Sequence, residues 1–398
     1  MKNTRLLLLL SACLGAAAPA QAQSVGIGTP TPNASAALDV SSTSQGLLLP
    51  CLTAAQRGSI VRPPLGLLVF QTDGSPGLYY FNGISWLNLT TGRVPDAAGT
   101  TPREVTTLAG MPTVAGSADG PGPTARFNSP YGVTVDADGT LYVADTNNNS
   151  IRKTTAAGVT TTLATGLGQP RNTALDAAGN LYVADRTNHV IRRITPAGVM
   201  STFAGIVAGS GNLNGPANLS RFNSPVGVAV DAAGAVYVSD TGNNAVRKIV
   251  GGMVSTLATG LSTPTAIAVD AAGTLFVAET FTHVVRTITP AGVVTVLAGA
   301  VGVAGSADGP VATARLNSPN GVAAGPVGTV YVADTGNSII RQISGGVVST
   351  LAGLAGVGAS VDGSAANARF SSPFGVAVDA TGTLYVADTG NNTIRVIR

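Results

Sequence analysis

LYVADTGNNTIR, from Leu384 to Arg395, is the stretch that decides the fold of this chain. Close copies span Leu141–Arg152, Val236–Arg247 and Val330–Arg341, and weaker copies span Leu181–Arg192 and Leu275–Arg286. Each copy joins two short apolar runs through a turn rich in polar residues and Gly, which is the pattern of two antiparallel strands. Six copies along one chain indicate a repeat architecture.

Each copy lies within a unit of four strand-like runs that opens after a proline. In the third unit we expect strands at Gly227–Val230, Ala235–Ser239, Ala245–Ile249 and Met253–Ala258. Four short antiparallel strands form one blade of a β-propeller, and a blade buries both of its faces only against neighbouring blades. The sequence therefore predicts an all-β fold, a six-bladed β-propeller over residues 104–398 that follows a small β module.

The number of strands predicts how the ring closes. The first three strands occur in all six units, but the fourth follows only five of them, because the chain ends at Arg398. The missing type of strand stands near the start of the repeats, where Val105–Ala109 matches Val254–Ala258. Pairing of this N-terminal strand with the last unit would close the propeller and remove two exposed sheet edges.

The repeated stretch resembles the NHL repeat, and the resemblance covers about three quarters of the chain. It implies a β-propeller, and with the leader described below it resembles secreted Bacteroidetes proteins. It implies no single function, since members of the family include sensor domains, RNA-binding modules, partner-binding scaffolds and a few lyases.

Every unit repeats an acid at the end of its second strand and an arginine seven positions later. The acids are Asp145, Asp185, Asp240, Glu279, Asp334 and Asp388, and the arginines are Arg152, Arg192, Arg247, Arg286, Arg341 and Arg395. Sixfold repetition favours a structural ion pair or a carboxylate that caps a turn, because a catalytic site needs different residues in different roles. The alternative is a ring of acids that holds cations.

Four of the links between units are equally long and share their chemistry, which indicates a specified conformation. Three of them carry Asp-Gly, and all four carry an arginine before an apolar residue: Asp119, Asp308 and Asp362, and Arg126, Arg221, Arg315 and Arg369. We expect these arginines to anchor the links on backbone carbonyls. The alternative places them at the central funnel, where they would hold carboxylates or anionic glycans. The links are expected to crowd one face, and these seven residues are the candidate ligand contacts.

The first residues are typical of an export signal, and the charge argues against nucleic acid as a partner. Lys2 and Arg5, the apolar run after them and the small residues Ala20 and Ala22 of a small-x-small cleavage site predict a signal peptide over residues 1–22. The alternative is a lipoprotein anchor at Cys13. Without Lys2 and Arg5 the formal charge falls from +3 to +1, which lacks the basic surface that phosphate backbones require. No other stretch is long and apolar enough to span a membrane.

Residues 23–92 are expected to form a separate small β module, with a linker over residues 93–103. The module resembles leaders that precede surface and fibre-like repeats, and it implies attachment or assembly. Its aromatic residues at 79–81 and Trp86 flank Asn82-Gly83, which predicts a hairpin with its turn at that dipeptide.

The sequence favours binding over catalysis. The only histidines, His189 and His283, occupy the same position in the second and fourth units, and we interpret them as repeat variation. No catalytic residue, metal ligand or cofactor is assigned. The leading hypothesis is an exported (secreted, periplasmic or surface) scaffold, monomeric in its propeller, that recognises a protein or glycan. The alternatives are a metal-dependent lyase or lactonase and a structural envelope or fibre-associated protein.

Overall fold

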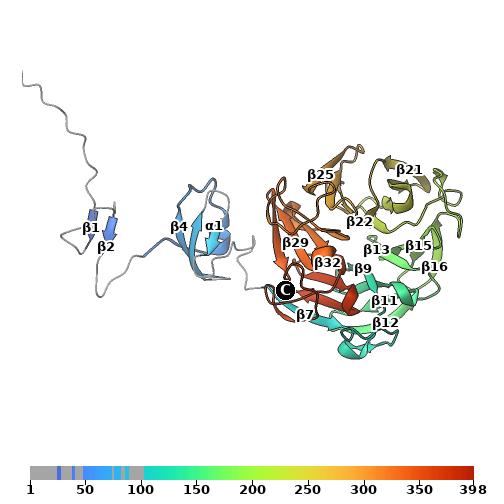
Figure 1. Cartoon of the computed structure of the whole chain (residues 1–398), viewed down its shortest axis with the longest axis horizontal. Helices are drawn as coiled ribbons and strands as arrows, with labels where there is room; N and C mark the ends of the chain where they lie inside the picture. Colours follow the sequence, from blue (N-terminus) through green and yellow to red (C-terminus); the bar gives the residue numbers. More distant parts are fainter. Residues whose placement is uncertain (1–24, 28–37, 41–47, 74–75, 82–85, 89–102) are drawn as a thin grey trace, which may run out of the picture. The chain divides into compact units, whose positions relative to one another are not determined.

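The computed structural model describes residues 25–27, 38–40, 48–73, 76–81, 86–88 and 103–398 (Figure 1). The chain divides into two compact units, Met1–Thr101 and Pro102–Arg398. The predicted signal peptide, Cys13 and most of the predicted linker lie outside the described residues. In the part of the chain that the structure describes, no helix combines the length and the apolar character that a membrane crossing requires.

The described residues of the first unit form two small sheets and one short helix. Strand β1 (Val25–Ile27) pairs in parallel with β2 (Leu38–Val40). The second sheet has the order β3 (Cys51–Leu52), β4 (Leu68–Gln71), β5 (Gly77–Phe81) and β6 (Trp86–Asn88). Helix α1 (Ala54–Gly58) begins at a capping box formed by Thr53 and Gln56. Strands β5 and β6 are antiparallel, as the hairpin requires, and the Asn82-Gly83 turn lies outside the described residues.

The second unit contains six antiparallel sheets, which we number as blades 1 to 6 in chain order (Figure 1). Blade 1 consists of β9 (Pro130–Val135), β10 (Leu141–Asp145), β11 (Ser150–Thr154) and β12 (Val159–Ala164); blade 2 of β13 (Pro170–Leu175), β14 (Leu181–Asp185), β15 (Val190–Ile194) and β16 (Met200–Ala204); and blade 3 of β18 (Gly227–Val230), β19 (Val236–Asp240), β20 (Ala245–Val250) and β21 (Met253–Ala258).

Blade 4 consists of β22 (Pro264–Val269), β23 (Leu275–Glu279), β24 (Val284–Ile288) and β25 (Val294–Gly299); blade 5 of β27 (Gly321–Ala324), β28 (Val330–Asp334), β29 (Ile339–Ser344) and β30 (Val347–Ala352); and blade 6 of β32 (Pro373–Val378), β33 (Leu384–Asp388), β34 (Thr393–Ile397) and β7 (Glu104–Ala109). Short 3-10 turns occur at η1 (Gly122–Thr124), η2 (Thr146–Asn148), η3 (Thr241–Asn243), η4 (Pro326–Gly328), η5 (Thr335–Asn337) and η6 (Thr389–Asn391).

The ring closes through the N-terminal strand, which confirms the prediction made from the strand count. Strand β7 pairs with β34, the last strand of the chain, and the backbones of Glu104 and Arg398 exchange two hydrogen bonds of 2.9 and 3.0 Å. The first strands of the six blades contact one another in a closed cycle, from β9 through β13, β18, β22 and β27 to β32 and back to β9. The termini of the propeller are therefore held in one blade.

The turns explain why the repeated residues form these elements. In the hairpin between the first two strands of blade 3, Asp231 accepts hydrogen bonds from the backbone N–H groups of Ala233 and Ala235 and from the Tyr237 hydroxyl. Burial, and then this acid, raise the pKa of Tyr237 to about 12. Before the third strand, Asn244 adopts a left-handed conformation with φ of 52°, which Asn tolerates better than most residues.

The apolar core lies between the blades. Each cluster of buried side chains combines residues from two neighbouring blades, as where Ile394 of blade 6 packs with Val143 of blade 1. Each long link contributes one large apolar side chain that is fully buried, at Phe127, Phe222, Leu316 and Phe370. Each of these side chains packs in a cluster between two neighbouring blades and thereby fixes its link to both.

Part of each long link runs along the outer edge of the next blade. Two-residue strands at β8 (Gly120–Pro121), β17 (Gly215–Pro216), β26 (Gly309–Pro310) and β31 (Gly363–Ser364) pair with the outermost strands β12, β21, β30 and β7. An outermost strand has unpaired N–H and C=O groups, and the link satisfies some of them. The long links are expected to crowd one face of the propeller, and their two-residue strands lie at its outer edge.

Candidate binding site at the mouth of the central channel

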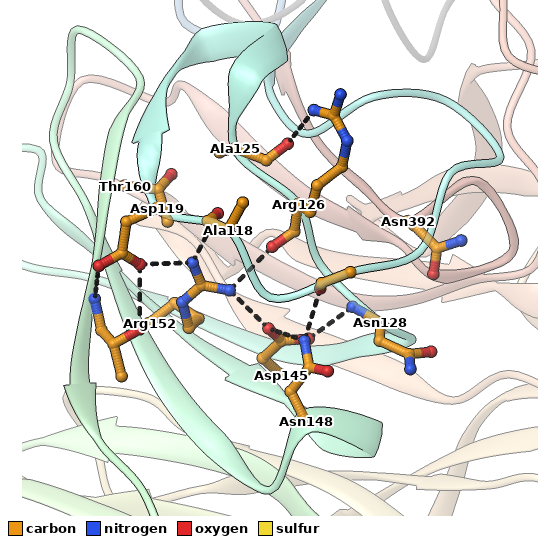
Figure 2. A network of polar contacts seen from close by, with 12 residues as sticks. Ala118, Asp119, Ala125, Arg126, Asn128, Asp145, Asn148, Arg152, Thr160 and Asn392 are labelled. Carbon is orange, nitrogen blue, oxygen red and sulfur yellow. Dashed lines mark hydrogen bonds and ion pairs between the residues drawn. The ribbon is translucent and has the colours of Figure 1, made fainter.

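The repeated acid and arginine form an ion pair in each of the six blades; the acid is buried in all six, and the arginine is buried in blades 1, 3, 5 and 6. In blade 1 the Nη1 atom of Arg152 lies 2.8 Å from Asp145 (Figure 2). Its Nη2 atom lies 2.7 Å from Asp119 of the preceding long link, and the guanidinium also donates to the carbonyls of Arg126 and Ala118. Equivalent pairs of 2.8 to 2.9 Å join Asp185–Arg192, Asp240–Arg247, Glu279–Arg286, Asp334–Arg341 and Asp388–Arg395.

The same acid also organises the turn that follows it. Asp145 accepts a hydrogen bond of 2.7 Å from the backbone N–H of Asn128 and another of 2.7 Å from the Asn148 side chain. Burial raises the pKa of Asp145, although these donors and Arg152 oppose it. Both oxygens of the carboxylate therefore have partners, and the acid joins the second strand to the turn, the third strand and the link.

The long-link acids belong to these networks. Asp308 lies 2.6 Å from Arg341, and Asp362 lies 2.5 Å from Arg395. These contacts correspond to that between Asp119 and Arg152. Burial by itself would raise the pKa of Asp119. Hydrogen bonds from Arg152 and Thr162 outweigh burial, so the pKa of this carboxyl lies below its ordinary value. Because these acids contact the third and fourth strands, they lie away from the channel.

The long-link arginines hold their own links. Arg126 donates to the carbonyl of Ala125 (Figure 2) and to that of Pro123. Arg315 and Arg369 bind carbonyls of their links in the same way, whereas Arg221 packs against Gly209 and Gly211. The structure brings none of the seven candidate contacts to the channel, and their role in ligand contact stays a prediction.

The two histidines are hydrogen-bond acceptors between blades. The Nδ1 atom of His189 accepts from the backbone N–H of Ser224, and that of His283 accepts from Ser318, both at 3.0 Å. Asn149, Asn244 and Asn392 make the equivalent bond with their side-chain oxygens. Both histidines therefore do what asparagine does in three other blades. The described residues contain no cluster of three or more His, Cys, Asp and Glu side chains that could hold a metal ion.

A channel of about 350 Å³ runs between the first strands of the six blades. Its lining consists of Val, Ala, Leu and Ile residues together with Thr134, Asn172 and Thr173. Among the described residues this lining holds no titratable side chain. The lining begins two or three residues after the repeat prolines, so the residues directly after the prolines stand beyond its end.

Those residues form a layer across the end of the channel, which we call the mouth layer. It consists of Tyr131, Arg171, Val226, Thr265, Asn320 and Phe374, one from each blade. The Tyr131 hydroxyl donates to the side-chain oxygen of Asn320 at 3.0 Å, which connects blade 1 to blade 5. The Tyr131 ring also packs against Phe374 of blade 6, with ring centroids 4.7 Å apart. The mouth layer thus closes the channel on the side where the links enter the blades.

Arg171 and Arg186 give the mouth layer a positive charge beside blade 2. The guanidinium of Arg171 stacks over the Tyr131 ring at 4.6 Å. Burial lowers the pKa of Arg171, and the nearby charge of Arg186 lowers it further. Arg186 donates to the Gln169 side chain at 3.2 Å, and no acid among the described residues forms an ion pair with either arginine.

Sequence reasoning missed the mouth layer, although a signal was present. The positions of Tyr131 and its five equivalents directly follow the six repeat prolines, and alignment of the units at those prolines shows six different residues there. The surrounding positions repeat with few changes. Variation at one position inside an otherwise constant repeat makes that position a candidate for a role other than folding.

Family models match both parts of the chain. The model of the NHL repeat matches residues 127–153, 222–249 and 370–397, and the model of the Teneurin NHL domain matches residues 253–344. The chain contains NHL repeats. A model of a phage-tail-like trimerisation region matches residues 26–107, which agrees with the leader module predicted before the repeats.

The NHL repeats of this chain have propeller proteins as structural neighbours. A Bacteroides thetaiotaomicron protein of unknown function is 18% identical, with a TM-score of 0.66 over 82% of both chains. An auxiliary nutrient binding protein of the same organism is 18% identical, with a TM-score of 0.62 over 82% of this chain and 83% of its own. A Bacteroides ovatus auxiliary nutrient binding protein is 19% identical, with a TM-score of 0.63 over 75% and 76%. These likenesses show the fold.

A curated relative matches a shorter part of the chain. The SUPPRESSOR OF QUENCHING 1 protein of Arabidopsis thaliana is 37% identical over 95 residues, which are 23% of this chain. The match spans 9% of the length of that relative. It therefore carries no information about the activity of the whole chain.

Proposed function

We propose that the propeller is an exported recognition scaffold that binds a protein or glycan at the mouth layer. The observation that carries the proposal is the contrast within the repeat: the ion pairs, turns and core residues recur, whereas the six residues of the mouth layer all differ. Repetition maintains the frame, and the mouth layer combines a guanidinium, two aromatic rings, an amide and a hydroxyl. Such convergent, varied groups are typical of ligand sites.

The channel favours binding over the alternative of a metal-dependent lyase or lactonase. A propeller enzyme of that kind needs metal ligands and a general base that face the reacting group. The described lining of the channel offers apolar side chains, threonine hydroxyls and the Asn172 amide. These groups can position a ligand, but they supply neither a base nor a set of carboxylate or imidazole ligands. The nutrient-binding neighbours support the same proposal through their fold.

Binding at the mouth layer is tested with paired phenylalanine variants. Phe374 belongs to the mouth layer and is partly exposed, whereas Phe281 is 70% exposed in the turn between strands β23 and β24. We expect the full mature chain to retain ligands on a glycan and peptide array. Phe374→Ala should weaken the retained ligand about tenfold, since burial of an aromatic ring contributes about 1.5–3 kcal/mol.

The control variant is Phe281→Ala, which removes the same ring from another loop and is expected to bind as the unchanged chain does. Two results would contradict the proposal. One is an array without any retained ligand, and the other is equal loss of binding in both variants.

We also propose that the leader module assembles the chain into a homotrimer. Leu48, Leu49, Cys51, Phe70 and Leu78 line a depression of about 450 Å³ in the first unit. Leu48 is 86% exposed and Phe70 is 41% exposed. Apolar side chains gathered in this way are typical of interaction surfaces, and the match to a trimerisation region makes further copies of this chain the partner.

The trimer is tested by light scattering after size-exclusion chromatography of the full mature chain. We expect three times the monomer mass, and we expect the double variant Leu48→Gln, Phe70→Gln to elute as a monomer because it places amides in the apolar surface. Val61→Gln is the control, since Val61 is 87% exposed but does not line the depression. A monomeric parent chain, or a trimer that survives the double change, would rule out this assembly.

A further inference from the structure

Blade 2 departs from the other five blades at the residue after its repeated acid. In the other blades this residue is a threonine, at positions 146, 241, 280, 335 and 389, and its hydroxyl donates to the carbonyl of the next blade's repeat proline over 2.6 to 3.0 Å. In blade 2 the residue is Arg186, so this bond between neighbouring blades is absent among the described residues at the passage from blade 2 to blade 3. A repeat that gives up a structural bond at one position indicates a role beyond folding.

Blade 2 places a second arginine near the first, because Pro170 and Asp185, which directly precede the two arginines, are paired across strands β13 and β14. Arg171 is the mouth-layer residue of the same blade, where the other blades have uncharged residues. The charge of Arg186 lowers the pKa of Arg171 after the larger effect of burial. Two guanidinium groups in partial burial without a carboxylate repel each other. A negatively charged group bound between them would remove this repulsion.

The hydrogen-bonding groups of this pair are prepared for a ligand. Stacking on Tyr131 fixes the plane of the Arg171 guanidinium, and the bond to Gln169 orients that of Arg186. Tyr131 is itself held by Asn320 and Phe374. The Nε atom of Arg171 is buried and has no hydrogen-bond partner, and its Nη atoms donate to no described residue. A guanidinium group that is held in place and has unused N–H donors is suited to bind a planar or tetrahedral oxyanion.

We infer that Arg171 and Arg186 form an oxyanion site that holds a carboxylate or phosphate group of the ligand. This inference rests on the proposed function and names the chemical class that the mouth layer recognises. Phe374 packs against the same Tyr131 ring and offers an apolar surface to the remainder of the ligand. The site differs from the seven link residues singled out in the sequence, which bind within their own links and blades.

The experiment measures binding of three probes to the full mature chain by isothermal titration calorimetry. The probes are trigalacturonate, which carries carboxylates, inorganic phosphate, and neutral trigalactose. We expect trigalacturonate or phosphate to bind and trigalactose to bind at least tenfold more weakly; the preferred probe identifies which oxyanion the site takes. Equal binding of charged and neutral sugars, or no binding of either anion, would overturn the inference.

The decisive variant is Arg171→Thr, Arg186→Thr. It gives blade 2 the pair of threonines that blade 4 already has, where Thr265 and Thr280 lie 3.1 Å apart, and we therefore expect it to fold with an unchanged or higher Tm. It should bind the charged probe about 100-fold more weakly, because charge-assisted hydrogen bonds are lost from both guanidinium groups. Undiminished binding in this folded variant would overturn the inference.

The matched control is Arg193→Thr, which removes a charge from strand β15 of the same blade at a distance from the mouth layer. Its affinity for the charged probe should equal that of the parent chain. A loss of affinity as large as that of the double variant would show that net charge, and not a specific site, causes the binding, and would overturn the inference. Array ligands that the double variant still binds would overturn the oxyanion site and leave the proposed scaffold standing. An array without ligands would instead overturn the scaffold.

Discussion

Deletion of residues 104–109 is expected to abolish the cooperative unfolding of the propeller. The deletion removes β7, which supplies the fourth strand of blade 6 and buries Val105 and Ala109 completely. Blade 6 would then expose the edge of β34, together with apolar surface that packs against blade 5 and blade 1. The loss should exceed about 5 kcal/mol, comparable with the whole stability of many domains, and thermal unfolding followed by circular dichroism should show a broad transition with aggregation.

A rescue variant separates ring closure from other effects of this deletion. Appending Gly-Gly-Met-Val-Ser-Thr-Leu-Ala after Arg398 supplies the fourth strand from the C-terminal side, with the sequence that follows the third strand of blade 3. We expect the extended chain to recover a single sharp transition. A deletion variant that keeps the parent Tm, or an extended chain that stays unfolded, would contradict the role assigned to β7.

Arg395→Met is expected to lower the free energy of unfolding by about 3–5 kcal/mol, the range for breaking a buried ion pair by removal of one partner. The guanidinium is fully buried and contacts Asp388 at 2.9 Å and Asp362 at 2.5 Å, as well as the carbonyls of Arg369 and Val361. Methionine fills part of the volume and leaves Asp388 as a buried charge. Urea denaturation measures the loss, and Arg398→Met, at the exposed last residue, is the control with an expected change below about 0.5 kcal/mol.

The destabilisation by Arg395→Met should depend on pH. Burial raises the pKa of Asp388 to about 6 in the folded protein, against about 3.9 when unfolded. The folded state therefore binds the proton more tightly, and stability falls as the pH rises from about 4 to about 6. Without Arg395 the pKa of Asp388 rises further, so the loss continues above pH 6. We expect a larger deficit at pH 8 than at pH 5, and equal deficits at both pH values would contradict this account.

The architecture could be predicted because its signals are local and repeat along the chain. Alternation of apolar residues and the turn residues around Asp231 and Asn244 specify strands and hairpins within a few residues of one another. Counting the strands also predicted the pairing of β7 with β34, since a single strand was missing at one end and present at the other. The observed ends of individual strands differ by one residue from the predicted ends. Strand β19, for example, includes Asp240, because the pairing with the neighbouring strand continues to this acid.

The candidate site could not be predicted in the same way. The sequence directed attention to Asp119 and Arg126 because their motif recurs in the long links, yet recurrence marks structural contacts in this protein. The pairing of β8 with β12 at the outer edge of blade 1 is made by backbone groups. Backbone hydrogen bonds place few demands on side chains, so the sequence did not indicate this pairing. Residues that differ in every unit looked like ordinary variation until the ring placed them together.

The amino-acid sequence by itself determined the repeated blades, the turns, the acid and arginine pairs and the strand that closes the ring, because each depends on residues close in the chain or on a count of like segments. Only the tertiary structure decided which residues meet across the axis. Tyr131 and Asn320 are separated by 189 positions, and closure of the ring makes them neighbours. The same holds for the proposed oxyanion site. Arg171 and Arg186 can bind an anion together only because the packing of blade 2 holds their guanidinium groups near each other.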